Sequence, residues 1–250
     1  MHIEVVTLFP DLIQQALRVG VLGRAVERQL VRVSCEDPRA HTSDVHRTVD
    51  DRPYGGGPGM VLTPKPMAAA IDAAAARLPA GLPRIYMSAQ GVPFTQSLAE
   101  EFSKLPGLVL VAGRYEGLDE RVIESRIDRE VSVGDYVLSG GEFPALVVID
   151  AVARLLPGVL GDERSNVEES FDAGLLDWPH YTRPVEFEGR TVPQVLQGGH
   201  HADIQRWRLK QAVARTWMRR PDLIARGGLA ADAAQLLDEF LAEREGERHG

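Results

Sequence analysis

The sequence predicts an α/β fold whose parallel sheet is covered by helices on both faces. In the first 160 residues, short β-branched runs alternate with segments that have the apolar periodicity of a helix. Strands separated by helices pair in parallel, and a parallel sheet needs cover on both faces. Ligands of such sheets bind at the carboxyl ends of the strands. We therefore expect a ligand site where these strands end.

The elements follow in order along this region. The first predicted strand begins at Ile3, and the last helix of this region begins in the apolar segment near Phe143. The predicted strands are Ile3–Leu8, Leu30–Cys35, Ile85–Ser88, Leu108–Ala112 and Glu130–Val133. The predicted helices are Asp11–Val19, Gly23–Gln29, Pro66–Arg77, Phe94–Lys104, Leu118–Arg126 and Pro144–Leu156.

The alternation ends near residue 160. Pro157 and Gly158 break the last helix, and a polar segment without periodicity follows. The sequence thus predicts an α/β domain at 1–160, a flexible linker at 161–173 and a small helical domain at 174–250, with helices at about Ala202–Arg219 and Ala230–Arg244.

The composition is that of a globular protein with an apolar core. Hydrophobic residues make up 44% of the chain and charged residues 26%. Asp150 and Arg154 interrupt the longest apolar run, so no membrane span is predicted. The single Cys35 excludes an internal disulfide and a cysteine-based zinc site. Because the first strand begins without a basic leader, we expect a cytoplasmic protein.

The charge is distributed unevenly along the chain. The formal net charge is −8, which by itself disfavours nucleic acid. The segment Ile204–Arg220, however, contains no acidic residue, and this basic stripe is compatible with docking a polyanion at one place. A solvated helix face is the alternative interpretation. The basic residues of the stripe are Arg206, Arg208, Lys210, Arg215, Arg219 and Arg220.

The stretch Ser132–Glu142 is the strongest candidate for a ligand-binding loop. It lies between a predicted strand and a predicted helix, and its glycines allow sharp turns and close approach to a ligand. Gly113 and Gly134 both come just after predicted strands, which indicates one shared site. The common nucleotide signatures are absent: Gly55–Gly59 is not followed by the lysine of a P-loop, and no G-x-G-x-x-G follows the first strand.

Five motifs along the chain resemble, in the same order, those of the bacterial tRNA (guanine-N1)-methyltransferases of the trefoil-knotted (SPOUT) superfamily. They are His46–Gly59, Gly113–Gly117, Val133–Gly141, Asp177–Pro184 and Trp207–Gln211. The resemblance implies a trefoil-knotted α/β domain and a homodimer with the active site at the subunit interface. It also implies transfer of a methyl group from S-adenosylmethionine to N1 of the guanosine immediately 3′ of the tRNA anticodon. Spacing rules do not predict the knot, because threaded chains are rare.

The resemblance further implies that loops after the knotted strands enclose S-adenosylmethionine. Glycine amides and apolar side chains in these loops suit such a ligand. Glu116 is open to several interpretations: it approaches the sulfonium, binds Mg²⁺ as an additional ion, or is a turn residue. No protein metal site is predicted. The implied lining residues are Tyr86, Met87, Ser88, Gly113, Tyr115, Glu116, Ser132, Val133, Gly134, Asp135, Tyr136, Val137, Leu138, Gly140, Gly141 and Pro144.

Methylation of N1 requires removal of the N1 proton and stabilisation of negative charge on the guanine oxygen. A carboxylate suits the first task and a guanidinium the second. Correspondence with the family assigns the base to Glu169 and the cation to Arg154. The family's usual base is an aspartate, one methylene shorter than Glu169, and Glu168 is an alternative base. Without the resemblance, Arg154 is typical of a surface arginine and Glu169 of a solvated carboxylate.

The resemblance places two segments on the tRNA. The first is a polar, glycine-rich loop with His46, Asp50, Arg52 and Gly59, whose local alternative is an ordinary turn. The second is the basic stripe, where the implied phosphate contacts are Arg206, Arg208, Lys210 and Arg215. Two other functions remain open on the sequence: a different α/β enzyme that binds ATP or NAD, and a noncatalytic RNA-binding module.

Overall fold

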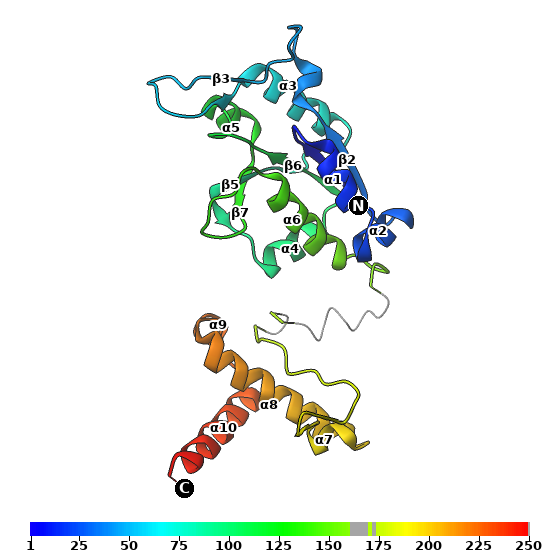
Figure 1. Cartoon of the computed structure of the whole chain (residues 1–250), viewed down its shortest axis with the longest axis vertical. Helices are drawn as coiled ribbons and strands as arrows, with labels where there is room; N and C mark the ends of the chain where they lie inside the picture. Colours follow the sequence, from blue (N-terminus) through cyan, green and yellow to red (C-terminus); the bar gives the residue numbers. More distant parts are fainter. Residues whose placement is uncertain (161–169, 172–173, 250) are drawn as a thin grey trace. The chain divides into compact units, whose positions relative to one another are not determined.

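The computed structural model describes residues 1–160, 170–171 and 174–249 of the chain, the last three of these by backbone only. The chain divides into two compact units, Met1–Glu163 and Arg164–Gly250 (Figure 1). No helix among the described residues is long and apolar enough to cross a membrane. The predicted linker at 161–173 lies outside the described residues, apart from 170 and 171.

The first unit is built on a five-stranded sheet in which all neighbouring strands are parallel. The strand order is β2-β1-β6-β5-β7. This arrangement confirms the predicted α/β class and places every predicted strand within a few residues, except for the end of β5. The strands are β1 (His2–Val6), β2 (Arg32–Glu36), β5 (Arg84–Pro93), β6 (Gly107–Ala112) and β7 (Arg129–Ser132).

Helices cover both faces of this sheet, as predicted. Figure 1 shows α3 and α5 on one side and α4 and α6 on the other. Along β6, Leu108 and Leu110 pack into one core, whereas Val109 and Val111 pack into the opposite one. A strand buried on both faces therefore needs an unbroken apolar sequence. The helices are α1 (Pro10–Ala16), α2 (Gly20–Glu27), α3 (Pro64–Ala76), α4 (Gln96–Ser103), α5 (Glu120–Arg126) and α6 (Glu142–Arg154).

Strand β5 is longer than the sequence predicts. It extends beyond Ser88 to Pro93, and its register with β7 shifts between Met87 and Val92. A side chain at Gly91 would overlap the backbone of β7 at Val131. Glycine therefore allows the bulged strand to stay against its neighbour.

After β7 the chain returns from the edge of the sheet, past β5, to the carboxyl end of β6. There the backbone N–H of Gly141 donates to the carbonyl of Gly113 at 2.8 Å, and Arg114 and Gly140 form an isolated antiparallel bridge. A Cβ at Gly141 would overlap Ala112, so this crossing requires glycine. The return path is consistent with the knotted fold that the resemblance implies.

A short hairpin that the sequence does not predict lies beside the sheet. It pairs β3 (Asp50–Asp51) with β4 (Val61–Leu62) in antiparallel fashion. The loop next to β3 projects from the body of the unit (Figure 1). A 3₁₀ turn, Pro38–His41, precedes it and was not predicted either.

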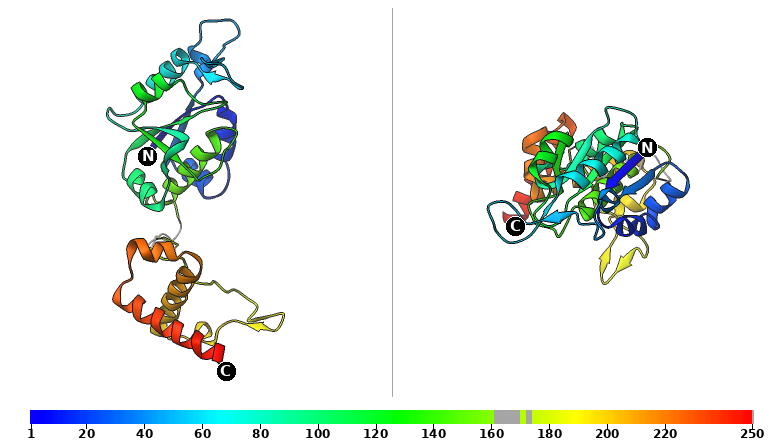
Figure 2. Two further views of the ribbon diagram at one scale, coloured as in Figure 1. Left: turned by 90° about the vertical axis from the view of Figure 1, so that its left-hand side faces the viewer. Right: turned by 90° about the horizontal axis from the view of Figure 1, so that it is seen from above.

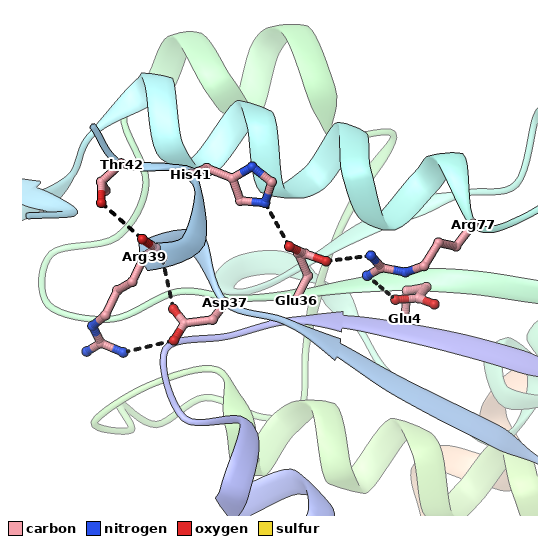
Figure 3. Close-up of polar contacts among 7 residues, drawn as sticks. All are labelled: Glu4, Glu36, Asp37, Arg39, His41, Thr42 and Arg77. Atoms are coloured by element: carbon pink, nitrogen blue, oxygen red, sulfur yellow. Dashed lines mark hydrogen bonds and ion pairs between the residues drawn. The ribbon is translucent and has the colours of Figure 1, made fainter. Parts of the chain in front are cut away.

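A network of charged side chains holds β1, β2 and α3 together (Figure 3). Glu4 is fully buried and accepts a 2.6 Å hydrogen bond from Arg77, which also pairs with Glu36. His41 contacts the other oxygen of Glu36 at 2.7 Å, and His2 contacts Glu4 at 2.8 Å. The network thus fixes the β2 edge of the sheet to the end of α3.

The second unit is mainly helical, and α8 packs against α10. Its small core contains Val213 and Ala214 of α8 with Leu236 of α10. The two predicted helices are confirmed, whereas the β8–β9 hairpin, seen in yellow in Figure 2, and two short helices were not predicted. The elements are β8 (Glu186–Phe187), β9 (Arg190–Thr191), α7 (Gln194–Gln197), α8 (His201–Arg219), α9 (Pro221–Gly227) and α10 (Ala231–His249).

Candidate functional site

A cavity of about 280 Å³ lies at the carboxyl ends of β5, β6 and β7. It is close to the lower limit of ordinary small-molecule pockets. Residues within β5 and the two loops that follow β6 and β7 form its wall, together with the first turn of α6. A site at the carboxyl edge is expected for a sheet of this class. The lining residues are Tyr86–Gln90, Gly113–Gly117, Val131–Gly134, Tyr136–Leu138, Gly140, Gly141 and Pro144.

The structure brings together in this cavity the residues that the sequence grouped as donor-binding, with the exception of Asp135. Ala89 and Gln90 were missed because they belong to the bulged extension of β5, for which Gly91 was the only local signal. Arg114 lies within the predicted lining segment Gly113–Glu116, whereas Gly117 and Val131 were passed over.

Tyr86 lines the cavity and packs closely against Gly113 and Gly117. Its hydroxyl lies only 2.8 Å from the position that a Cβ at Gly113 would occupy and 2.9 Å from that of a Cβ at Gly117. Burial raises the pKa of the Tyr86 hydroxyl above its ordinary value, so this group is protonated at neutral pH. The two glycines are therefore needed in part to admit Tyr86, not only to approach a ligand.

The loop 113–117 has a strained backbone beside the cavity. Tyr115 has a φ of 58°, a left-handed conformation that is uncommon for a side chain of this size. The loop is held in place by the hairpin, because Glu116 N–H donates to Met60 and Leu62 N–H donates to Gly117, both at 2.9 Å. Such strain persists only where the surroundings determine the conformation, and it is typical of functional sites.

The glycine-rich loop between β3 and β4 reaches this cavity at one point. Gly59 lies against the carboxylate of Glu116, since a Cβ at Gly59 would overlap Glu116. His46 and Arg52 are exposed, and Asp50 is half-buried in β3. The structure therefore brings the predicted RNA-contacting loop next to the predicted donor-binding loop.

In the second unit, the basic stripe of α8 is partly neutralised. Arg206 pairs with Glu239 of α10 at 2.6 Å, and Lys210 pairs with Glu243 at the same distance. These acids are about thirty positions away in the sequence, so the segment alone does not show them. Arg208 lies over the ring of Trp178, 4.9 Å from its centroid, and Arg215 is half-buried.

The family described as tRNA (Guanine-1)-methyltransferase TrmD matches residues 1–226. The chain belongs to this family. The match spans both loops that line the cavity, the β3–β4 loop and helix α8, so the resemblance inferred from the motifs is confirmed.

Several relatives match over nearly the whole chain, and each is named tRNA (guanine-N(1)-)-methyltransferase. One from Methylococcus capsulatus is 56% identical over 245 residues, which is 98% of each chain. One from Coxiella burnetii is 54% identical over 241 residues, covering 96% of this chain and 98% of its own. One from Salmonella schwarzengrund is 52% identical over 249 residues, covering 100% of this chain and 98% of its own.

Arg154, which the family resemblance assigned to catalysis, does not line the cavity. Arg154 ends α6, whereas Pro144 at the start of this helix lines the cavity. Ten residues of helix place the two about 15 Å apart. Glu169 and the alternative base Glu168 lie outside the described residues. Among the residues that are described, no cluster of three or more His, Cys, Asp or Glu could hold a metal ion.

Proposed function

We propose that the protein transfers a methyl group from S-adenosylmethionine to N1 of the guanosine immediately 3′ of the tRNA anticodon. The observation that carries the proposal is that the family's two loop motifs, Gly113–Gly117 and Val133–Gly141, line a single cavity at the carboxyl edge of a parallel sheet. Membership of the methyltransferase family and the names of relatives that are more than 50% identical support the acceptor class.

The cavity fits the chemistry of the proposed donor. The glycines of the two loops allow the backbone to approach a ligand closely, and Leu138 and Val133 provide apolar surface. S-adenosylmethionine supplies an electrophilic methyl group when bound. Glu116 at the cavity wall is a carboxylate that suits either the positive sulfonium or a hydrated Mg²⁺ ion.

The proposed acceptor chemistry requires a base and a cation. We assign removal of the N1 proton to Glu169, and stabilisation of the charge on the guanine oxygen to Arg154. Because Arg154 is about 15 Å from Pro144 along α6, a second copy of the chain is the proposed source of the arginine at each cavity.

Exposed apolar residues near the cavity support such a homodimer. Val137 on the glycine loop is 92% exposed. Phe143 and Val147, one turn apart on α6, are about half-exposed and extend this surface along the helix. An apolar surface of this kind is typical of an interaction site. A homodimer would cover it and complete the active site.

We assign tRNA contacts to the β3–β4 loop and to helix α8. Polar side chains and exposed glycine backbone near Glu116 suit recognition of an unstacked base. Arg208 and Arg215 of α8 suit phosphate groups.

The decisive experiment combines the purified protein with labelled S-adenosylmethionine and two tRNA transcripts, with guanosine or adenosine 3′ of the anticodon. Label is expected in the first transcript only. No incorporation into it, with donor binding intact, would overturn the acceptor assignment. Competition by ATP or NAD at equal affinity would overturn the donor assignment.

A matched pair of variants tests the base in the same assay. Glu169→Gln is expected to reduce turnover by at least 100-fold, within the usual range for a general base, whereas Glu168→Gln retains it. The opposite pattern would move the assignment to Glu168.

A further inference from the structure

A buried carboxylate lies directly behind the cavity. Glu142, in the first turn of α6, is 0% exposed and is not one of the lining residues. Its Oε1 accepts a hydrogen bond from the hydroxyl of Thr7 at 2.8 Å. Its Oε2 is 2.8 Å from Nε of Arg114, although these two atoms are not aligned for a hydrogen bond. A charge without access to water is costly unless it is paired, so this pair constrains where Arg114 lies.

Arg114 connects this carboxylate to the cavity wall. Its Nη1 donates to the carbonyl of Ser139 at 3.1 Å, and its guanidinium lies over the ring of Phe9, 4.4 Å from the centroid. A Cβ at Gly140 would overlap the Arg114 side chain, so glycine leaves room for it. One arginine thus touches the loop 133–141, the start of α6 and the segment after β1.

We propose that Glu142 is a positioning residue for the methyl donor. Glu142 acts through Arg114 to hold the loop 133–141 in the conformation that binds the donor. This inference rests on the proposed use of S-adenosylmethionine. Glu142 itself does not touch the donor. Its role is to fix the guanidinium that supports Ser139 and Gly140, and Thr7 in turn fixes the second oxygen of Glu142. In metal sites, residues that orient the ligands commonly change affinity or activity by a factor of 10 to 100, and we expect an effect at the lower end of this range here.

The first test measures the donor's dissociation constant by calorimetry and the KM for each substrate. Glu142→Gln keeps the shape of the side chain and removes its charge. We expect about tenfold weaker donor binding and a similar rise in the KM for the donor, with the KM for tRNA unchanged. Thr7→Val removes only the hydroxyl and is expected to weaken donor binding about threefold.

The matched control is Glu4→Gln, at a second fully buried carboxylate of the same unit that is paired with Arg77, away from the cavity. It is expected to lower the melting temperature and to leave donor affinity within twofold. Equal losses of donor affinity in Glu4→Gln and Glu142→Gln would overturn the proposal.

The double variant Arg114→Met, Glu142→Leu separates positioning from stability. Replacing a buried pair by apolar residues commonly restores stability. We expect the melting temperature to approach that of the wild type. Donor binding should stay about tenfold weaker than in the wild type, because the hydrogen bond from Arg114 to Ser139 is still missing. Recovery of both would overturn the proposal. Absence of donor binding in the wild type would instead contradict the proposed function.

Discussion

Glu4 and Glu142 are both fully buried in the same unit, and both are paired with an arginine. Their surroundings differ. Glu4 is tied through Arg77 to Glu36 and thus joins β1, β2 and α3, none of which contributes a residue to the cavity wall (Figure 3). Glu142 is tied through Arg114 to the loop that forms that wall. A buried glutamate–arginine pair can therefore contribute to stability in one place and to ligand binding in another, depending on which segment the arginine contacts.

The largest effect on the stability side of this comparison is expected for Arg77→Met. It leaves the Glu4 carboxylate buried with His2 as its remaining ion-pair partner among the described residues. We expect a loss of about 3 kcal/mol in the free energy of unfolding, because breaking a buried pair strands a charge. Donor affinity should stay within twofold of the wild type. Urea denaturation and calorimetry measure the two quantities.

Arg129→Met provides the control, since Arg129 pairs with Glu101 at an exposed position. Arg129→Met should lower the free energy of unfolding by less than about 1 kcal/mol. Two results would contradict the proposed difference between the Glu4 and Glu142 pairs. One is a loss of unfolding free energy in Arg77→Met that is no larger than in Arg129→Met. The other is a loss of donor affinity in Arg77→Met as large as that in Glu142→Gln.

A smaller effect on stability is expected from the pH dependence of the network that joins Glu4, Arg77 and Glu36. Burial raises the pKa of Glu36, but hydrogen bonds from His41 and Arg77 outweigh burial, so the pKa lies below its ordinary value of 4.5. A carboxylate whose pKa is lower in the folded state stabilises the fold above its unfolded pKa. This contribution is present above about pH 4.5 and is lost as the pH falls through the lower, folded value.

We therefore expect the free energy of unfolding to decline below pH 4.5 and Glu36→Gln to flatten part of this decline. Equilibrium denaturation between pH 3 and pH 6, roughly the range over which carboxylates titrate, measures the slope. An unchanged slope in Glu36→Gln would show that other carboxylates cause the decline.

The smallest effect concerns the exposed ion pairs of the second unit. Glu239 contacts both Arg206 and Lys210, at 2.6 and 4.0 Å. Glu239→Gln should leave the free energy of unfolding nearly unchanged, because the ion pair is solvated. It should also tighten tRNA binding about threefold and steepen its salt dependence, since freed cations are available to phosphates.

Asp238→Asn is the matched control for this change. Asp238 is exposed on the same helix, and its substitution removes the same charge. Filter binding at several salt concentrations compares the two variants. Equal effects would indicate that general charge, and not the contact with Arg206, sets the affinity.

Much of the cavity could be predicted from the sequence because its parts are contiguous. The loops 113–117 and 133–141 each directly follow a strand, and strands in a parallel sheet present their ends at one edge. Ala89 and Gln90 could not be predicted, because a bulge depends on the register between two strands. Asp135 was grouped with the loop but does not line the cavity.

The catalytic assignments show a different limit. Arg154 was placed at the site by correspondence with the family, yet it lies at the far end of α6 from the cavity. Its assignment therefore depends on a second copy of the chain. The prediction of a basic stripe on α8 was also incomplete, because it did not include the acidic partners on α10.

The sequence by itself determined the alternation of strands and helices, the parallel sheet and the family, since these depend on periodicity and on contiguous motifs. Only the tertiary structure decided which charges meet. Thr7 and Glu142 are 135 positions apart, and Arg206 and Glu239 are 33 apart. Such pairs depend on strand order and helix packing, which bring distant segments together, and no local pattern records them. The contact between Glu142 and Arg114 behind the cavity can therefore be identified in the fold, but not from the sequence of the loop 133–141.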